Sequence, residues 1–457
     1  MLLTTSDADR KLSYDCLKCV IQKLEVNFRF RLAKRLPKIS SAEKAAPLYI
    51  STLSISEASF RLNDATYRLG VIQQAREGPT PEIIETLNQL GGNWVDIDRF
   101  GLEMRSLPEL TPGDILIQDY DPDLELNDNL ETAEARLVRE QRRLADLERY
   151  KMEIENEPDY LVEPGSLDRG RRIRRKRMIQ ILDKYNTKIG ETKLNVQRFQ
   201  CKRDNLPWPY DMFIQLTRKS PDGTVYIECF NYDKSLKEAQ KYLISKLLGN
   251  RRVVTKIKSL SFWPFLNDKG LVIGLPDGVK FDVQEFGTCG KLSEVLQRVE
   301  TILEYPNRPF ARLASDSLRL EDVQNPRVRQ AEVLELTQNF RVNVMAFYRE
   351  VTNKKVVITL TNGIFPDQYA MIVENLIDTK GTLGTCYEFA RLRDKDKASN
   401  ALRVIAERFV NAVVGERFVT IPLPNQLQLD VSYAPYQLNS GTRVYTIKVE
   451  VVRNRSN

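Results

Sequence analysis

The chain contains no histidine among its 457 residues. Imidazole is the commonest general base in enzymes and the commonest metal ligand, so its absence weighs against hydrolase triads and metal chemistry. The sequence also lacks the G-x-x-x-x-G-K and G-x-G-x-x-G patterns of phosphate-binding loops. We therefore predict no catalytic residues, no metal site and no cofactor, and we expect that the protein is not an enzyme.

Long apolar runs and clustered cysteines are missing as well. No stretch approaches the roughly eighteen apolar residues of a membrane span, and the first residues lack the apolar core of a signal peptide. The 6 cysteines are scattered, which is typical of a reducing compartment. Cys16 and Cys19 form a C-x-x-C without a second pair, so we interpret them as half-buried helix residues. These features predict a cytoplasmic or nuclear protein with no membrane partner.

Positive charge is concentrated in one short run. The net charge is +7, from 69 basic and 62 acidic residues, and the segment 169–177 alone carries seven basic side chains. Three interpretations stay open: a solvated helix start, a nuclear import signal, or an anchor for phosphate or anionic lipid. No aromatic residues interleave the run, so nucleic acid is the least favoured partner. The residues of this basic arm are Arg171, Arg172, Arg174, Arg175, Lys176 and Arg177.

The most informative segment is 12–39, with the sequence LSYDCLKCVIQKLEVNFRFRLAKRLPKI. Its first half predicts a helix, because apolar residues recur there at three- and four-residue steps. Ser13 is a suitable N-cap, and Asp15 lies near the positive end of the helix. If this helix binds a partner, we expect the anchors to be Leu12, Leu17, Val20, Ile21 and Leu24.

The second half of the segment predicts another short helix. Asn27 is expected to cap it, Phe28, Leu32 and Leu36 to form its apolar stripe, and Pro37 to end it. From the periodicity alone, a helical hairpin that only closes a core is the favoured interpretation over a docking module.

This hairpin resembles an F-box, the helical module that docks onto the Skp adaptor of cullin–RING ubiquitin ligases. Further blocks resemble the nematode F-box C family, including GGNWVDIDRFGLEMRS from 91, KRDNLPWPY from 202 and AVVGERFVTIPLPNQLQLDVSY from 412. The resemblance implies a non-catalytic adaptor that binds a Skp-type subunit and an unknown protein substrate. An F-box usually begins Leu-Pro, whereas Ser13 stands at the proline position here. That departure favours an alternative, an interaction scaffold whose F-box is degenerate and does not engage the ligase.

The chain divides by pattern into four parts. The first three are an F-box-like helical module at 10–47, a small β-rich mixed segment at 48–122 with one helix from Pro81 to Leu90, and a charged helical hairpin or coiled coil at 123–205. Leucines at seven-residue steps (Leu130, Leu137, Leu144) indicate the first helix of that hairpin.

Strands alternate with helices over 206–457, which predicts an α/β domain. The loose recurrence of helix and short strand resembles leucine-rich-repeat solenoids, so we expect a solenoid-like arrangement. Examples are a helix from Leu236 to Leu248 and strands from Leu318 to Glu321 and from Val356 to Leu360. The aromatic group of Trp208, Tyr210 and Phe213 at the start of this part is expected in a core, with a recognition surface as the second choice. The predicted fold class is α+β or α/β with several domains.

Overall fold

The fold was examined in a computed structural model of the full chain. It describes residues 13–104, 109–118, 132–161, 169–264, 271–316, 319–338, 348–360, 364–438 and 441–454. Leu12 and Leu130 therefore lie outside the described residues.

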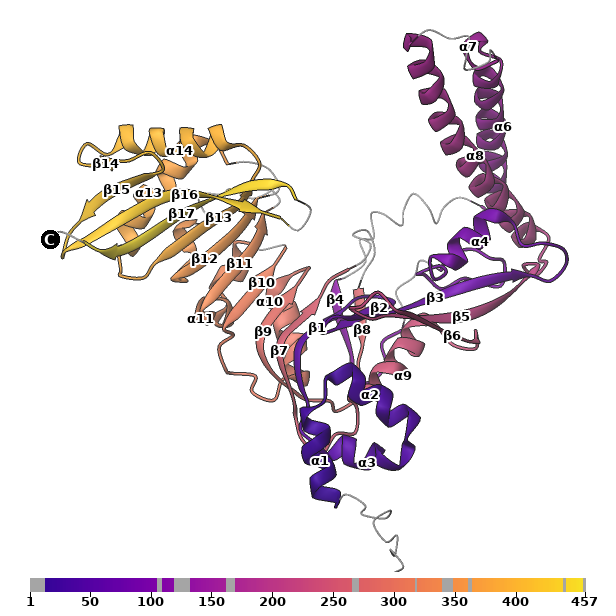
Figure 1. Ribbon diagram of the computed structural model, residues 1–457, viewed down its shortest axis with the longest axis horizontal. Helices are drawn as coiled ribbons and strands as arrows, with labels where there is room; N and C mark the ends of the chain where they lie inside the picture. The colour runs from indigo at the N-terminus through magenta and orange to yellow at the C-terminus, as the bar shows by residue number, and fades with distance from the viewer. Residues whose placement is uncertain are drawn as a thin grey trace, which may run out of the picture.

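A mixed sheet of 15 strands runs the length of the molecule (Figure 1). Its middle is parallel, and neighbouring strands there follow one another in chain order. These strands are β1 (Tyr49–Ile55), β7 (Thr255–Phe262), β9 (Phe281–Thr288), β10 (Arg312–Ser315), β11 (Val333–Gln338), β12 (Lys355–Leu360) and β13 (Cys386–Leu392). The fold class is thus mixed α/β, as predicted.

Helical segments connect β9 to β10, β10 to β11 and β12 to β13, because parallel neighbours need a crossover connection. Alternate strand residues such as Leu313, Leu334 and Val356 are fully buried, because the connections pack against that face. The intervening residues stay half-exposed, as in the Arg312–Glu335 ion pair across β10 and β11. The connections are α10 (Leu292–Val299), η3 (Glu300–Ile302), η4 (Glu321–Gln324), α11 (Pro326–Gln330) and α13 (Pro366–Lys380).

Antiparallel strands extend the sheet at both ends. Beyond β1 come β2 (Ser59–Leu62), β3 (Ala65–Ala75), β5 (Tyr210–Lys219) and β6 (Val225–Asn231). Beyond β13 come β17 (Arg443–Arg453), β16 (Leu427–Gln437), β15 (Phe418–Leu423) and β14 (Val413–Val414), with α14 (Lys395–Arg408) packed on them. A separate pair, β4 (Asp114–Gln118) with β8 (Leu271–Gly274), adds Ile115, Ile117 and Ile273 to the main core.

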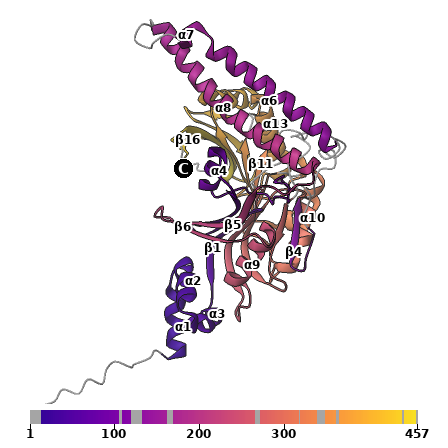
Figure 2. The ribbon, with the colours of Figure 1, turned by 90° about the vertical axis from the view of Figure 1, so that its right-hand side faces the viewer.

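Two helical units project from the sheet on opposite sides of the molecule (Figure 2). The N-terminal unit comprises α1 (Tyr14–Lys23), α2 (Val26–Arg35), η1 (Pro37–Ile39) and α3 (Ser40–Ala45). The other is a long arm of two helices that pack side by side, α6 (Ala133–Glu155) and α8 (Arg169–Arg203), with the short α7 (Pro158–Leu161) at its tip. The predicted hairpin is therefore formed within one chain.

Several sequence-based expectations need correction. The strands between 48 and 122 do not form a layer of their own, because β1 pairs with β7 about two hundred residues later in the chain. The strand predicted from Leu318 to Glu321 is not formed in its described part. Glu321 begins a 3-10 turn, and the carboxylate of Asp322 accepts the N–H groups of Ser293 and Arg319. The helix predicted from Pro81 is present as α4 (Glu82–Gln89).

Candidate partner-docking site

The first helix forms as its sequence predicts. Ser13 is the N-cap of α1, its Oγ accepts the Cys16 N–H at 3.2 Å, and Asp15 lies in the first turn. The cap satisfies an amide that has no partner inside the helix, and the carboxylate favours the positive helix end. The residue at the usual proline position of an F-box therefore has a local structural role here.

The inner face of α1 closes a small core. Ile21 is only 1% exposed and packs with Ala42 and Ala46, while Leu17 lies partly buried at the edge of this cluster. Of the predicted anchors, Ile21 is thus unavailable to a partner, because its side chain already supports the hairpin. Leu17 and Leu24 are half-buried.

The second helix begins earlier than predicted and turns a different face inward. Its N-cap is Glu25, whose carboxylate accepts the Phe28 N–H at 2.8 Å, and not Asn27. Asn27 is buried and joins the helix to the sheet: its amide donates to the Leu62 carbonyl and accepts the Tyr67 hydroxyl. Val26 and Phe30 enter the main core.

Large apolar side chains remain on the outside of this N-terminal hairpin. They are 44% to 51% exposed, and the predicted stripe residues Phe28 and Leu36 are among them. The stripe was misjudged because Arg29 occupies an inner position, which breaks the apolar period of the buried face. We call these residues the outer apolar set: Tyr14, Val20, Phe28 and Leu36.

A buried ion network fixes the hairpin to the rest of the protein. The Glu43 carboxylate on α3 lies 2.7 Å from Arg29 Nε and 2.6 Å from an Arg251 nitrogen, and all three side chains are at most 4% exposed. Arg29 also donates to the Glu43, Ala46 and Pro47 carbonyls. Burial lowers the pKa of Arg29 and of Arg251, but Glu43 and these carbonyls compensate their charge.

A second contact ties α3 to helix α9 (Leu236–Leu248). Lys44 Nζ donates to the carbonyls of Lys246, Leu247 and Gly249, where α9 ends and leaves carbonyls without helical partners. Burial lowers the pKa of Lys44 to about 8, with the charge of Arg251 as a further cause. With the ion network, this contact holds the hairpin in one orientation relative to the sheet.

The structure also places the predicted cysteine pair and the basic arm. Cys16 and Cys19 are both exposed, not half-buried, because they lie on the outer side of α1. Within the described residues, no group of three or more Cys, Asp or Glu side chains could hold a metal ion. The basic arm is the first part of α8; its side chains are exposed except for Arg175, which is half-buried beside Tyr160.

Trp208 and Tyr210 of the predicted aromatic group lie in a core, whereas Phe213 is half-buried. Trp208 is 1% exposed, stacks on Tyr210 with ring centroids 4.8 Å apart, and donates its indole N–H to Gln73. Ile84 of α4 and Leu194 of α8 complete this cluster, so it secures the base of the arm. A recognition surface at Trp208 is therefore excluded.

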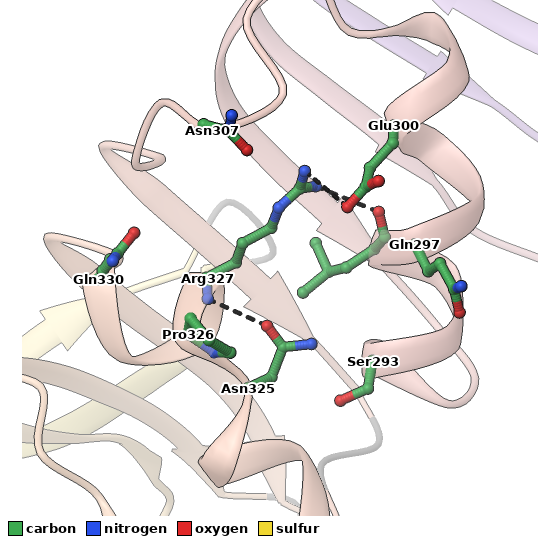
Figure 3. A pocket seen from close by; sticks show the side chains of 9 residues that line it. Ser293, Gln297, Glu300, Asn307, Asn325, Pro326, Arg327 and Gln330 are labelled. Carbon is green, nitrogen blue, oxygen red and sulfur yellow. Dashed lines mark hydrogen bonds and ion pairs between the residues drawn. The ribbon is translucent and has the colours of Figure 1, made fainter.

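One polar pocket of about 390 Å³ lies between α10 and α11 (Figure 3). Its only described cation, Arg327, pairs with Glu300 at 2.9 Å and donates to the Leu296 carbonyl. The charge of Arg327 is thus paired within the pocket lining.

Comparisons with known proteins match one region of the chain to a protein family. Residues 235–391, from α9 to β13, match the model of a family described as a domain of unknown function (DUF3557). No curated protein and no solved structure matches the chain. Across the described segments, no helix is both long and apolar enough to cross a membrane.

Proposed function

We propose that this protein is a non-catalytic adaptor whose N-terminal hairpin binds a Skp-type subunit of a cullin–RING ubiquitin ligase. The observation that carries the proposal is the outer apolar set on a hairpin whose inner face is already packed. Large exposed apolar residues on a rigid support are typical of docking surfaces. The resemblance of this hairpin and of later blocks to F-box C proteins supports the same role.

A rigid attachment of the N-terminal helices to the sheet is consistent with an adaptor role. A ligase must hold its substrate at a steady position relative to the site of ubiquitin transfer. The Glu43 network and the Lys44 contact join the docking hairpin to the body of the protein by buried polar bonds. A partner bound at Val20 and Phe28 would thus be held in a fixed orientation to the sheet.

We further propose that the parallel part of the sheet is a leucine-rich-repeat-like solenoid that presents the substrate. From β7 to β13, paired residues of neighbouring strands lie between 21 residues (Arg312 to Val333) and 31 residues (Lys355 to Cys386) apart. Leucine-rich repeats span about 20–29 residues and expose one face of such a sheet to ligands. In this proposal the protein works in the cytoplasm or nucleus, where such ligases act.

Co-expression with the cognate Skp-type adaptor tests the proposal. The wild type is compared with a Val20→Asp, Phe28→Asp double variant by size exclusion, and circular dichroism checks that both fold. Both side chains are exposed, so the variant should fold normally and lose the complex. A complex that survives both substitutions would place docking elsewhere.

The same experiment separates the alternative function. A wild type that elutes alone at high concentration would contradict ligase docking and leave an interaction scaffold with a degenerate F-box. The position of Ser13 is the observation that favours this second candidate.

A further inference from the structure

Strand β6 is a fully exposed edge strand of the large sheet. Among the described strands it is the last on its side of the sheet, and it pairs only with β5. All seven of its residues, VYIECFN, are exposed. Val225, Tyr226, Ile227 and Phe230 are large apolar residues among them. Both faces of the strand thus carry apolar side chains in contact with solvent.

This edge lacks the devices that normally prevent strand addition. Proteins protect sheet edges with short strands, lysines, prolines or bulges. β6 contains no lysine or proline, and its pairing with β5 is continuous from Val225 to Asn231 without a register shift. The strand at the opposite end of the sheet, β14, is protected because it has only 2 residues.

The outward backbone groups of β6 can be assigned from the turn that precedes it. The Ser220 N–H donates to the Thr224 carbonyl at 2.9 Å, so this pair is hydrogen-bonded. In an antiparallel ladder such pairs alternate, so the N–H and C=O groups of Val225, Ile227 and Cys229 point away from β5. These groups are ready to pair with an added strand.

The charges beside β6 define what kind of strand would fit. On the face that carries Tyr226 and Phe230, Arg218 lies 4.2 Å above the Tyr226 ring. Lys34 of α2 lies 2.6 Å from Glu228, so that acid is already paired. Arg31 lies one helical turn before Lys34 on α2. The opposite face presents Val225, Ile227 and Cys229.

We infer that β6 captures an extended segment of another protein as an added strand, with acidic side chains over the basic face and apolar side chains on the other. A second copy of this chain fits less well. Antiparallel pairing of two β6 strands about a twofold axis would bring the Arg31 and Arg218 charges of both copies onto the same face, where they repel. The inference extends the proposed function by naming a class of substrate segment, but its test needs no ligase subunit, so the two can fail separately.

The test uses the full chain and a fluorescent peptide of alternating Val and Glu, with a Val and Lys peptide of equal length as control. Fluorescence anisotropy should show saturable binding of the Val-Glu peptide, at least about tenfold tighter than of the control. Ile227→Pro removes one outward donor without breaking the β5 pairing, and should weaken binding about tenfold or more. The matched Ile227→Thr keeps the donor and should stay within about threefold.

Each other outcome overturns the inference. Absence of binding by the wild type would show that β6 is not a peptide-capturing edge. Equal binding by Ile227→Pro, with an unchanged circular dichroism spectrum, would place the peptide elsewhere. A concentration-dependent dimer that Ile227→Pro abolishes would identify a second copy as the occupant instead.

Discussion

The protein carries two helical units, the N-terminal unit and the long arm, that expose apolar residues to similar extents but are held in different ways. Val20 on α1 is 47% exposed, and Val138 on α6 is 44% exposed. The N-terminal hairpin is fixed by the buried Glu43 network. The long arm is crossed by exposed ion pairs, such as Lys193–Glu148 at 3.0 Å. Exposed apolar area alone therefore does not identify a docking surface. The arm is secured by an apolar cluster at its base, whereas the buried ion network distinguishes the N-terminal unit.

Removing one acidic partner from an ion pair in each helical unit should give the largest difference in the free energy of unfolding. Glu43→Gln leaves two buried guanidinium groups without their carboxylate, so we expect a loss of about 3–5 kcal/mol in the free energy of unfolding. Glu157→Gln, which removes the exposed ion pair with Arg174, should change it by less than about 1 kcal/mol. Urea titration of both variants measures the difference. Equal effects would contradict the proposed rigid support.

A pair of truncations on α1 separates the inner face from the outer face. Ile21→Ala creates a cavity in a packed cluster and should lower the free energy of unfolding by about 2–4 kcal/mol. Val20→Ala, one residue earlier on the exposed side, should change it by no more than about 0.5 kcal/mol. Thermal unfolding followed by circular dichroism provides the comparison. A large loss for Val20→Ala would mean that this side chain is packed and cannot dock a partner.

Asp316, directly after β10, contrasts with Glu43: it is a largely buried carboxylate that forms no ion pair with the cations of the described residues. Burial raises the pKa of Asp316 to about 6, and its Oδ1 has no hydrogen-bond partner. The folded state binds this proton more tightly than the unfolded chain, so stability falls as the pH rises through about 6. Asp316→Asn should be more stable than the wild type by about 1 kcal/mol at neutral pH, after allowance for solvent screening. Urea titrations at several pH values should show this gain disappear near the ordinary carboxyl pKa.

A small effect on stability is expected from the basic residues of the arm. Arg171, Arg172 and Lys176 are exposed on α8, so their joint replacement by Gln should change the free energy of unfolding by less than about 1 kcal/mol. Thermal unfolding measures this change. A loss above about 2 kcal/mol would show that the basic run supports the fold and is not a solvated helix surface.

Local signals in the sequence located individual elements well. The Ser13 cap of α1 and the span of α9 from Leu236 to Leu248 agree with their predictions. Caps and helical periods are encoded by residues a few positions apart, so sequence patterns reveal them. The buried face of a helix was harder to predict from the sequence. Ile21 and Val20 both satisfy the apolar spacing, and only the contacts with α3 determine that Ile21 is the buried one.

Contacts between distant parts of the chain could not be predicted from local sequence patterns. Glu43 and Arg251 are separated by 208 residues, and an isolated arginine gives no sign that it will be buried. The short strands β10, β11 and β13 were missed because neighbouring strands stabilise them on both sides. Both neighbours are parallel for β10 and β11, whereas β13 has one parallel and one antiparallel neighbour. The exposed edge at β6 was likewise visible only once the strand order was known.

The most direct test compares the same substitution on the two hairpins. Val20→Asp and Val138→Asp each place a charge at an exposed valine, and binding of the purified Skp-type adaptor is measured by calorimetry for both variants and the wild type. The account predicts at least about a tenfold loss of affinity for Val20→Asp and no more than about a twofold change for Val138→Asp. Equal affinities for the two variants, or a greater loss for Val138→Asp, would contradict docking at the N-terminal hairpin.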